Sequence, residues 1–230
     1  MSLDSRFRRK AQALYGKAMD LYPAKIGIVK GNMKLGKHMP NLSQPAVLTC
    51  PGATPYCQGA PGSGNEKHPC YNDHSLHYPS VQENHVGNYK ASFLPDYKDD
   101  LLVQVKDATR KHKIFRFHPE GDFYSVKYIH DWIHVVISCP DVTFFGFTRS
   151  WRVPNLLPHL DILRMLPNVS LYASTDPTTI EGPPDWNWAA MGVPEDTRFE
   201  ECPHASGAVA DCETCIRCAD TTIIPYFPLH

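Results

Sequence analysis

Four cysteines near the C-terminal end of the sequence are spaced as metal ligands. Cys212, Cys215 and Cys218 follow one another at intervals of three residues, and Cys202 lies upstream of them. A C-x2-C-x2-C run lets one short loop place three thiolates around an iron–sulfur cube, as in bacterial ferredoxins. Structural zinc also takes four thiolates, usually from two C-x2-C pairs set well apart. The cysteine cluster segment, residues 202–218, therefore predicts a [4Fe–4S] cluster, with zinc as the alternative.

A second group of cysteines, the cysteine trio, consists of Cys50, Cys57 and Cys70. Three cysteines without a fourth indicate an iron–sulfur cluster in which one iron takes a different ligand. Three nearby histidines could supply it: His68, His74 and His77. With zinc, three thiolates and one histidine would complete a structural site. The two cysteine groups either share one cluster or form two.

Polar side chains follow each of three predicted strands, at residues 114–118, 142–147 and 169–173. The carboxyl ends of parallel strands meet at one edge of a sheet, where ligands bind. We therefore expect a ligand-binding rim of six residues: His118, Glu120, Asp122, Arg149, Ser174 and Asp176. Carboxylates beside a guanidinium suit a small polar, zwitterionic or sugar-bearing ligand. For Ser174 the alternative is that it caps the following helix.

Helices separate these strands and indicate the fold class. Ser125 is typical of an N-cap and begins a predicted helix that continues to Ile137, and another helix is predicted over residues 154–166. Strand–helix–strand units at this spacing are typical of a parallel sheet with right-handed crossovers. We predict an α/β fold, parallel-stranded, in the form of a partial or complete TIM-like barrel with long metal-binding loops.

The remaining chain is predicted to form a single domain over residues 1–230 with an amphipathic N-terminal helix. Apolar residues recur every three or four positions within residues 1–22, as a helix requires. Residues 25–95 are mostly loop, rich in Gly, Pro, Asn and His, and contain the cysteine trio. Cys139 has apolar neighbours and is predicted to be a small buried hydrophobe.

The composition excludes several classes of protein. The chain has 230 residues, with 23 Lys and Arg against 24 Asp and Glu, so strong phosphate-driven binding of nucleic acid is not expected. A hydrophobic fraction of 42% excludes wholesale disorder. No apolar run reaches the roughly 18 residues of a membrane helix, and we find no secretory signal. We expect a cytoplasmic protein without disulfides.

Specific motifs give the sequence a family resemblance. They are Thr49-Cys-Pro-Gly-Ala-Thr54, Cys70-Tyr71, Phe115-Arg-Phe-His-Pro-Glu-Gly-Asp-Phe123, Phe147-Thr-Arg-Ser-Trp-Arg152 and the C-terminal cysteines. From about residue 31 to residue 218 the chain resembles the phage gene product 88-like family, which is found on phages, plasmids and in actinobacterial genomes. That family has no secure activity, so the resemblance implies a phage- or plasmid-type protein without naming a reaction.

The order of the same parts is distantly similar to that of radical SAM enzymes. These enzymes combine a cysteine trio, an α/β partial barrel, a Gly-Asp turn after a strand and, in some cases, a C-terminal iron–sulfur site. They ordinarily use C-x3-C-x2-C, whereas this chain has C-x6-C-x12-C. The resemblance implies S-adenosylmethionine at the open iron of the trio, beside the rim.

Our leading hypothesis is a phage-type iron–sulfur protein, either radical SAM-like or another redox enzyme, with an unknown substrate and no assigned catalytic residue. The alternative is a binding module that is stabilised by a bound zinc ion or iron–sulfur cluster and acts on a protein or nucleic-acid partner. Its contacts would come from the basic face of residues 6–17 and from four aromatic residues: Trp132, Trp151, Trp186 and Trp188. A zinc hydrolase is less supported, since the chain has no H-E-x-x-H pair.

Overall fold

The computed structural model describes residues 4–67 and 70–228 and contains one seven-stranded sheet. Its strands are β1 (Asn41–Leu42), β2 (Ile114–Phe117), β3 (Thr143–Thr148), β4 (Val169–Thr175), β5 (Asn187–Met191), β6 (Glu200–Glu201) and β7 (Pro225–Phe227). They pair in the order β1-β2-β3-β4-β5-β7-β6, and every pairing is parallel. The predicted parallel α/β class is confirmed.

The sheet is open over the described residues, so the TIM-like barrel that the sequence predicts is not formed. A closed barrel needs eight strands with a consistent stagger. Here β1 and β6 stand at opposite edges, and each is only two residues long. Strands this short offer too few backbone groups to pair with each other and close the sheet.

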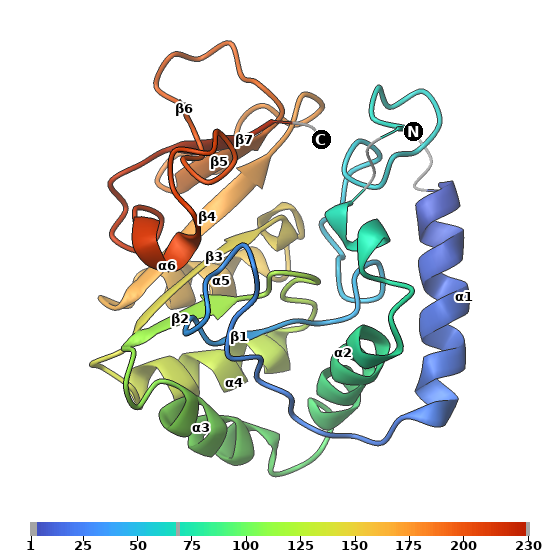
Figure 1. Cartoon of the computed structure of the whole chain (residues 1–230), viewed down its shortest axis with the longest axis vertical. Coiled ribbons are helices and arrows are strands. Elements are labelled where there is room, and N and C mark those ends of the chain that lie inside the picture. The colour runs from blue at the N-terminus through green and yellow to red at the C-terminus, as the bar shows by residue number, and fades with distance from the viewer. Residues whose placement is uncertain (1–3, 68–69, 229–230) are drawn as a thin grey trace.

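Three helices cover one face of the sheet (Figure 1). They are α3 (Tyr97–Ala108), α4 (Val126–Ile137) and α5 (Leu157–Arg164). Strands β1 to β5 succeed one another in chain order, and right-handed crossovers that all step in one direction place their helices on the same side. Outside this layer lie α1 (Arg6–Leu21) and α2 (Pro79–Ala91), which pack against each other.

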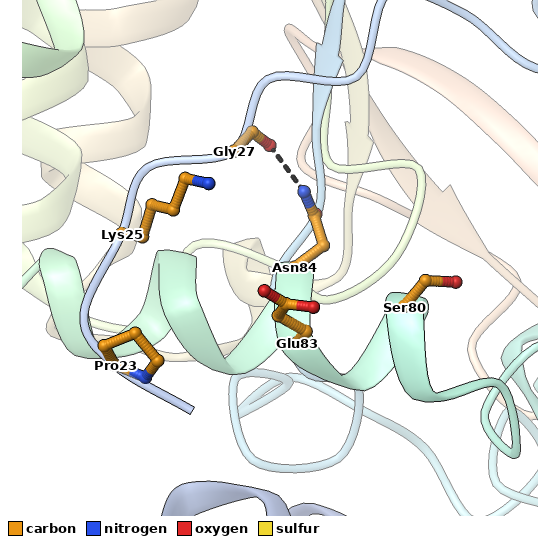
Figure 2. Close-up of a pocket in the computed structure, with 6 residues that line it drawn as sticks. All are labelled: Pro23, Lys25, Gly27, Ser80, Glu83 and Asn84. Atoms are coloured by element: carbon orange, nitrogen blue, oxygen red, sulfur yellow. Dashed lines mark hydrogen bonds between the residues drawn. The ribbon is translucent and has the colours of Figure 1, made fainter. Parts of the chain in front are cut away.

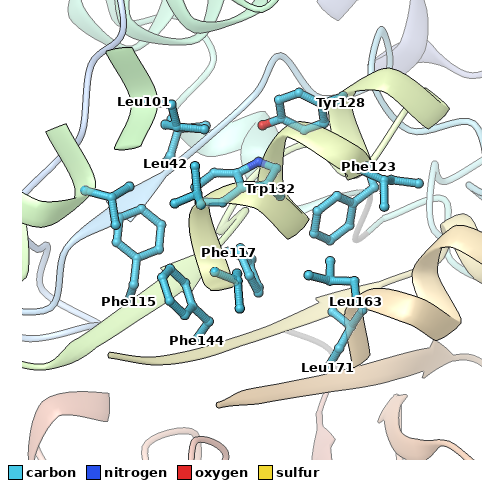
Figure 3. Packing of buried hydrophobic residues seen from close by; sticks show 14 of the residues in the cluster. Leu42, Leu101, Phe115, Phe117, Phe123, Tyr128, Trp132, Phe144, Leu163 and Leu171 are labelled. Atoms are coloured by element: carbon cyan, nitrogen blue, oxygen red, sulfur yellow. The ribbon is translucent and has the colours of Figure 1, made fainter. Parts of the chain in front are cut away.

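An aromatic core fills the space between the sheet and its helices (Figure 3). Successive side chains of a strand point to opposite faces, so Phe115 and Phe117 enter this core while Arg116 points away from it. The fully buried Trp132 of α4 meets the Phe117 ring edge-on at 5.1 Å between ring centroids. Cys139 lies in the same cluster and is 2% exposed, which confirms its prediction as a buried hydrophobe.

The opposite face of the sheet is covered by loops. Leu35 and Met39 pack there against Phe145 of β3 and Ala219 of the C-terminal segment. The Ser170 hydroxyl donates a hydrogen bond to the Ala219 carbonyl at 2.6 Å. The second face of the sheet therefore depends on a segment that contains only one short helix, α6 (Cys212–Cys215).

Two expectations for the N-terminal third have different outcomes. The predicted amphipathic helix is confirmed as α1, with Ser5 as its N-cap. The prediction of loop over most of residues 25–95 is wrong for α2, whose buried residues include His85, Gly87 and Asn88. The buried face of α2 is partly polar, so apolar residues do not recur along it at helical spacing, and the sequence pattern does not predict this helix.

The Ser125 cap of α4 leads to a stability prediction. The Ser125 hydroxyl accepts a hydrogen bond from the Tyr128 backbone N–H at 3.2 Å, as the sequence predicts. We expect Ser125→Ala to lower the free energy of unfolding by about 1 kcal/mol, because it leaves that N–H without its acceptor. Chemical denaturation measures the loss. Ser125→Thr, which keeps a hydroxyl, should stay close to the wild type, and equal losses in both variants would contradict the cap.

Candidate metal and ligand site

The loop that carries Cys50 and Cys57 rests directly on the carboxyl ends of β3 and β4. The Thr54 hydroxyl donates to Oδ2 of Asp176 at 2.6 Å, and Arg152 donates to the Gly52 carbonyl at 2.9 Å. A Cβ on Gly52 would lie 1.9 Å from the Arg149 carbonyl oxygen, so only glycine permits this approach. The cysteine trio is thereby placed at the predicted rim.

Asp122, Arg149 and Asp176 join the ends of three strands. The Arg149 backbone N–H donates to Oδ2 of Asp122 at 2.8 Å, and its guanidinium contacts Oδ2 of Asp176 at 2.7 Å. Burial raises the pKa of Asp122 to about 6, although hydrogen bonds from Thr148 and Arg149 lower it in part. Burial acts to raise the pKa of Asp176, but the Arg149 charge and hydrogen bonds from Thr178 and Thr54 together outweigh it, and the pKa falls.

Burial and neighbouring charges shift the pKa values of all three thiols of the trio. Burial raises the pKa of Cys50 most, and the charges of Asp122, Cys70 and Cys57 raise it further. Burial likewise raises the pKa of Cys57, whereas the positive charge of Arg149 lowers it. The pKa of Cys70 is raised by burial and by Cys57. Arg149 is therefore the cation that favours the thiolate, the form in which cysteine binds metals.

The two candidate metal centres require different spacings between their cysteine sulfurs. In residues 4–67 and 70–228, no group of three or more His, Cys, Asp or Glu side chains is placed to hold a single metal ion. A zinc ion at about 2.3 Å from each sulfur requires sulfurs about 3.8 Å apart. A four-iron cube is larger and separates its thiolates more widely. All eight cysteines are in the described residues as thiols, none in a disulfide.

Two histidines that the sequence predicts as site residues do not form part of the described site. His68, a candidate fourth ligand of the trio, lies outside the described residues. His118, a candidate for the rim, packs instead in the aromatic core, with its ring centroid 4.5 Å from that of Phe123 and Nε2 2.8 Å from the Tyr128 hydroxyl. Its φ of +29° marks a sharp bend directly after β2, which turns the side chain away from the rim.

Glu120 connects the rim to the two outer helices. Its Oε1 accepts a hydrogen bond from the Ser75 hydroxyl at 2.7 Å, and its Oε2 lies 2.7 Å from Nε2 of His85. The other ring nitrogen of His85 lies 2.8 Å from the Tyr15 hydroxyl of α1. Sequence reasoning missed His85 because α2 was not predicted. Its spacing of 35 residues from Glu120 gives no local signal.

Ser174 contributes to the rim only through its backbone. Its carbonyl accepts a hydrogen bond from the Trp151 indole N–H at 3.1 Å. Gly121, between Glu120 and Asp122, has a φ of +76°, a conformation that favours glycine, and it forms the turn between these two residues. The structure thus brings together Asp122, Arg149 and Asp176 with the trio. Glu120 lies close enough for its charge to act on Cys70 while it bonds to Ser75 and His85, and His118 lies in the core.

The aromatic residues of the binding-module alternative are not available for stacking. Trp132 and Trp186 are buried, and Trp151 and Trp188 are half-buried against the main core. On the basic face of α1, several cations already have partners. Lys10 pairs with Asp73 at 2.5 Å, and Arg9 pairs with Asp4 at 2.7 Å.

A hollow lies elsewhere, between residues 23–27 and α2 (Figure 2). It encloses about 160 Å³ and is lined by six residues: Pro23, Lys25, Gly27, Ser80, Glu83 and Asn84. The Asn84 side chain donates to the Gly27 carbonyl at 2.9 Å and fixes one wall. None of the trio or rim residues lines it, so we treat it as separate from the candidate site.

The fold and site define an α/β protein with an open parallel sheet and a cysteine-lined rim at the strand ends. Comparison with known proteins identifies its family. The profile of the Gene product 88 family matches residues 19–222, and the chain belongs to that family. The predicted gene product 88 resemblance is confirmed.

Two curated relatives come from mycobacterial phages. The chain is 40% identical over 79 residues to the Gene 88 protein of Mycobacterium phage L5 and 37% identical over 79 residues to that of phage D29. Each alignment covers 34% of this chain and 31% of the relative, so the chain matches about a third of the length of these proteins. No solved structure matches, and the radical SAM resemblance has no support from the comparisons. Within the described residues, no helix has the length and apolar character to cross a membrane.

The buried position of His118 predicts a pH dependence of stability. Burial and the nearby charge of Arg116 lower its pKa to about 3. Between pH 7 and pH 5 the unfolded chain takes up a proton at this histidine and the folded chain does not, so stability falls as the pH falls. We expect the wild type to lose about 2 kcal/mol more than His118→Gln over this interval, measured by denaturation at each pH. Replacement of the exposed His112 with Gln should leave the wild-type profile, and identical profiles for all three proteins would contradict a neutral buried His118.

The Arg149–Asp176 pair predicts a large loss when one partner is removed. The Asp176 side chain is 0% exposed, so Asp176→Ala leaves the guanidinium buried without its main counter-charge. We expect the free energy of unfolding to fall by about 3–5 kcal/mol. Asp196→Ala removes the more exposed Arg198–Asp196 pair and should cost less than about 1 kcal/mol. Thermal or chemical denaturation compares the two, and similar losses would show that burial of the rim pair is unimportant.

Proposed function

We propose that this member of the Gene product 88 family is an iron–sulfur protein whose cysteine trio holds a cluster at the rim. One iron of that cluster would lack a cysteine ligand and would face Asp122, Arg149 and Asp176. The observation that carries the proposal is the position of Arg149: its backbone N–H donates to Asp122, its guanidinium pairs with Asp176, and its charge acts on Cys57. Arg149 would then be the counter-charge of the metal-bound thiolates and also part of the small-molecule site.

The chemistry of the donors supports a cluster rather than a cysteine-rich core. Hydrophobic packing explains Cys139, whose neighbours are apolar. The trio has different neighbours: the charges of Asp122, Asp176, Glu120 and Arg149 all act on its thiols. Three thiols held among buried ionised groups favour metal binding, because a bound cation offsets the cost of placing several negative groups together.

The ligand that suits this rim is small and zwitterionic. Arg149 can bind a carboxylate, and Asp122 or Asp176 can accept hydrogen bonds from an ammonium group. S-adenosylmethionine carries both groups and is the first molecule to test. A bound cluster supplies electron transfer and an open iron site, while this chain's residues orient the ligand and exclude water.

Metal and sulfide analysis of anaerobically purified protein tests the cluster. We expect Cys57→Ala to lower iron and acid-labile sulfide by about four atoms each per chain, because three-cysteine ligation is lost. Cys139→Ala, a matched removal of a cysteine outside both groups, should retain the wild-type content. Zinc alone in protein from iron-replete cells would overturn the proposal, as would a Cys57→Ala variant with the full iron content.

Ligand binding is tested separately by EPR of the reduced protein. S-adenosylmethionine, or another small zwitterion, should change the cluster spectrum of the wild type. Arg149→Lys keeps the positive charge but loses the forked geometry of the guanidinium, so the ligand-induced change should weaken while iron content stays within the wild-type range. A spectrum that responds equally in both proteins would remove Arg149 from the ligand site.

A further inference from the structure

The four C-terminal cysteines lie in a place of their own. Cys212 and Cys215 are on α6, whose N-cap Asp211 accepts a hydrogen bond from the Thr214 backbone N–H at 2.8 Å. Ile216 ends this helix in a left-handed conformation, and the chain then turns to Cys218. In Figure 1, α6 lies across the view from the loop that carries the trio.

Backbone hydrogen bonds hold this turn against the loop that precedes β1. The Cys212 N–H donates to the Lys34 carbonyl at 2.9 Å, and the Glu213 N–H donates to the Leu35 carbonyl at 3.0 Å. The His38 N–H donates in return to the Glu213 carboxylate at 3.1 Å. The side chains of Cys212 and Cys218 pack on the small apolar cluster over this face of the sheet.

Three of the four sulfurs belong to one short turn, because Cys212 and Cys215 share α6 and Cys218 packs with Cys212 against the same small apolar cluster. Burial raises the pKa of Cys218 to about 12, and the charges of Cys202, Cys212 and Cys215 each raise it further. The charge of Arg116 acts in the opposite direction on Cys218, and the charges of Arg116 and Lys34 do so on Cys212. Four thiols therefore converge on a region of the sheet face that holds cationic side chains.

The position of Arg116 follows from the strand pattern. It lies between Phe115 and Phe117 on β2, so it points to the face opposite the helices. Its guanidinium stacks over the Phe147 ring at 4.4 Å from the ring centroid, and Lys34 lies over the Phe227 ring at 5.3 Å. A thiolate-ligated cluster carries net negative charge, which such cations offset in a poorly hydrated site.

We propose that Cys202, Cys212, Cys215 and Cys218 bind a second iron–sulfur cluster, independent of the trio, that fixes residues 202–223 across the open face of the sheet. Arg116 and Lys34 supply its counter-charge. The proposal uses different cysteines from the rim site and does not rest on the proposed function there.

The need for such a cross-link follows from the fold. Helices cover one face of the sheet, but the other is covered by the loop that carries Leu35 and Met39 and by residues 202–223, which contain the four-residue helix α6. The hydrophobic cluster beneath it is small, with the buried residues Leu35, Met39, Phe145 and Ala219. So small a cluster contributes little burial energy, and a bound metal centre contributes folding energy directly.

Cysteine alkylation of the wild-type chain tests the second cluster without any substitution. Anaerobic protein is treated with iodoacetamide before and after removal of iron by a chelator, and each cysteine peptide is quantified by mass spectrometry. We expect the four C-terminal cysteines to be protected at least tenfold until the iron is removed. Equal alkylation before and after chelation at these four positions would overturn the proposal, whatever happens at the trio.

Iron counts of matched variants identify the metal and separate the two sites. Cys215→Ser should lose about four irons per chain and keep those of the trio, and Cys57→Ala should show the reverse. Loss of zinc instead of iron from Cys215→Ser would overturn an iron–sulfur cluster at this position. Hydrogen exchange provides the structural readout. Amides of residues 202–223 should exchange faster in Cys215→Ser than in the wild type, and at the wild-type rate in Cys139→Ala. Unchanged exchange in both variants would contradict the role of the cluster in fixing this segment.

Discussion

The candidate site depends on the interactions of Arg149, whose guanidinium is buried. Its backbone N–H holds Asp122 at the end of β2, its side chain holds Asp176 at the end of β4, and its charge acts on Cys57. A cation in a buried place is stable only when its negative partners stay within contact distance. This requirement fixes the cysteine loop, the turn after β2 and the end of β4 relative to one another.

The open sheet explains why the chain has two different cysteine groups. Its carboxyl edge, where three strands end in polar residues, carries the trio and the rim. Its second face, where Arg116 and Phe145 point away from the helices, is covered by loops that include the C-terminal four cysteines. One sheet therefore presents two places for thiolates. Arg149, which follows β3, is the cation near the first, and Arg116 of β2 is the cation near the second. The packing of α4 on β2 keeps both places in position.

Much of the fold could be predicted because its signals are local. Ser125 caps α4 through a residue three positions away, and the apolar bodies of β2, β3 and β4 are continuous in the sequence. Helix α2 could not be predicted, because His85 and Asn88 are buried through hydrogen bonds to residues distant in the chain. His118 could not be assigned correctly, since the bend after β2 depends on packing among Phe123, Tyr128 and Trp132.

The sequence by itself determined the α/β class, the parallel strands, the family resemblance and the polar residues at each strand end. These follow from periodicity and spacing, which act over a few residues. Only the tertiary structure decided that the sheet stays open, that the trio meets Arg149, and that the two cysteine groups lie apart. The physical reason is that charge pairing and burial join residues from distant segments, such as Thr54 with Asp176, and sequence spacing carries no record of those distances.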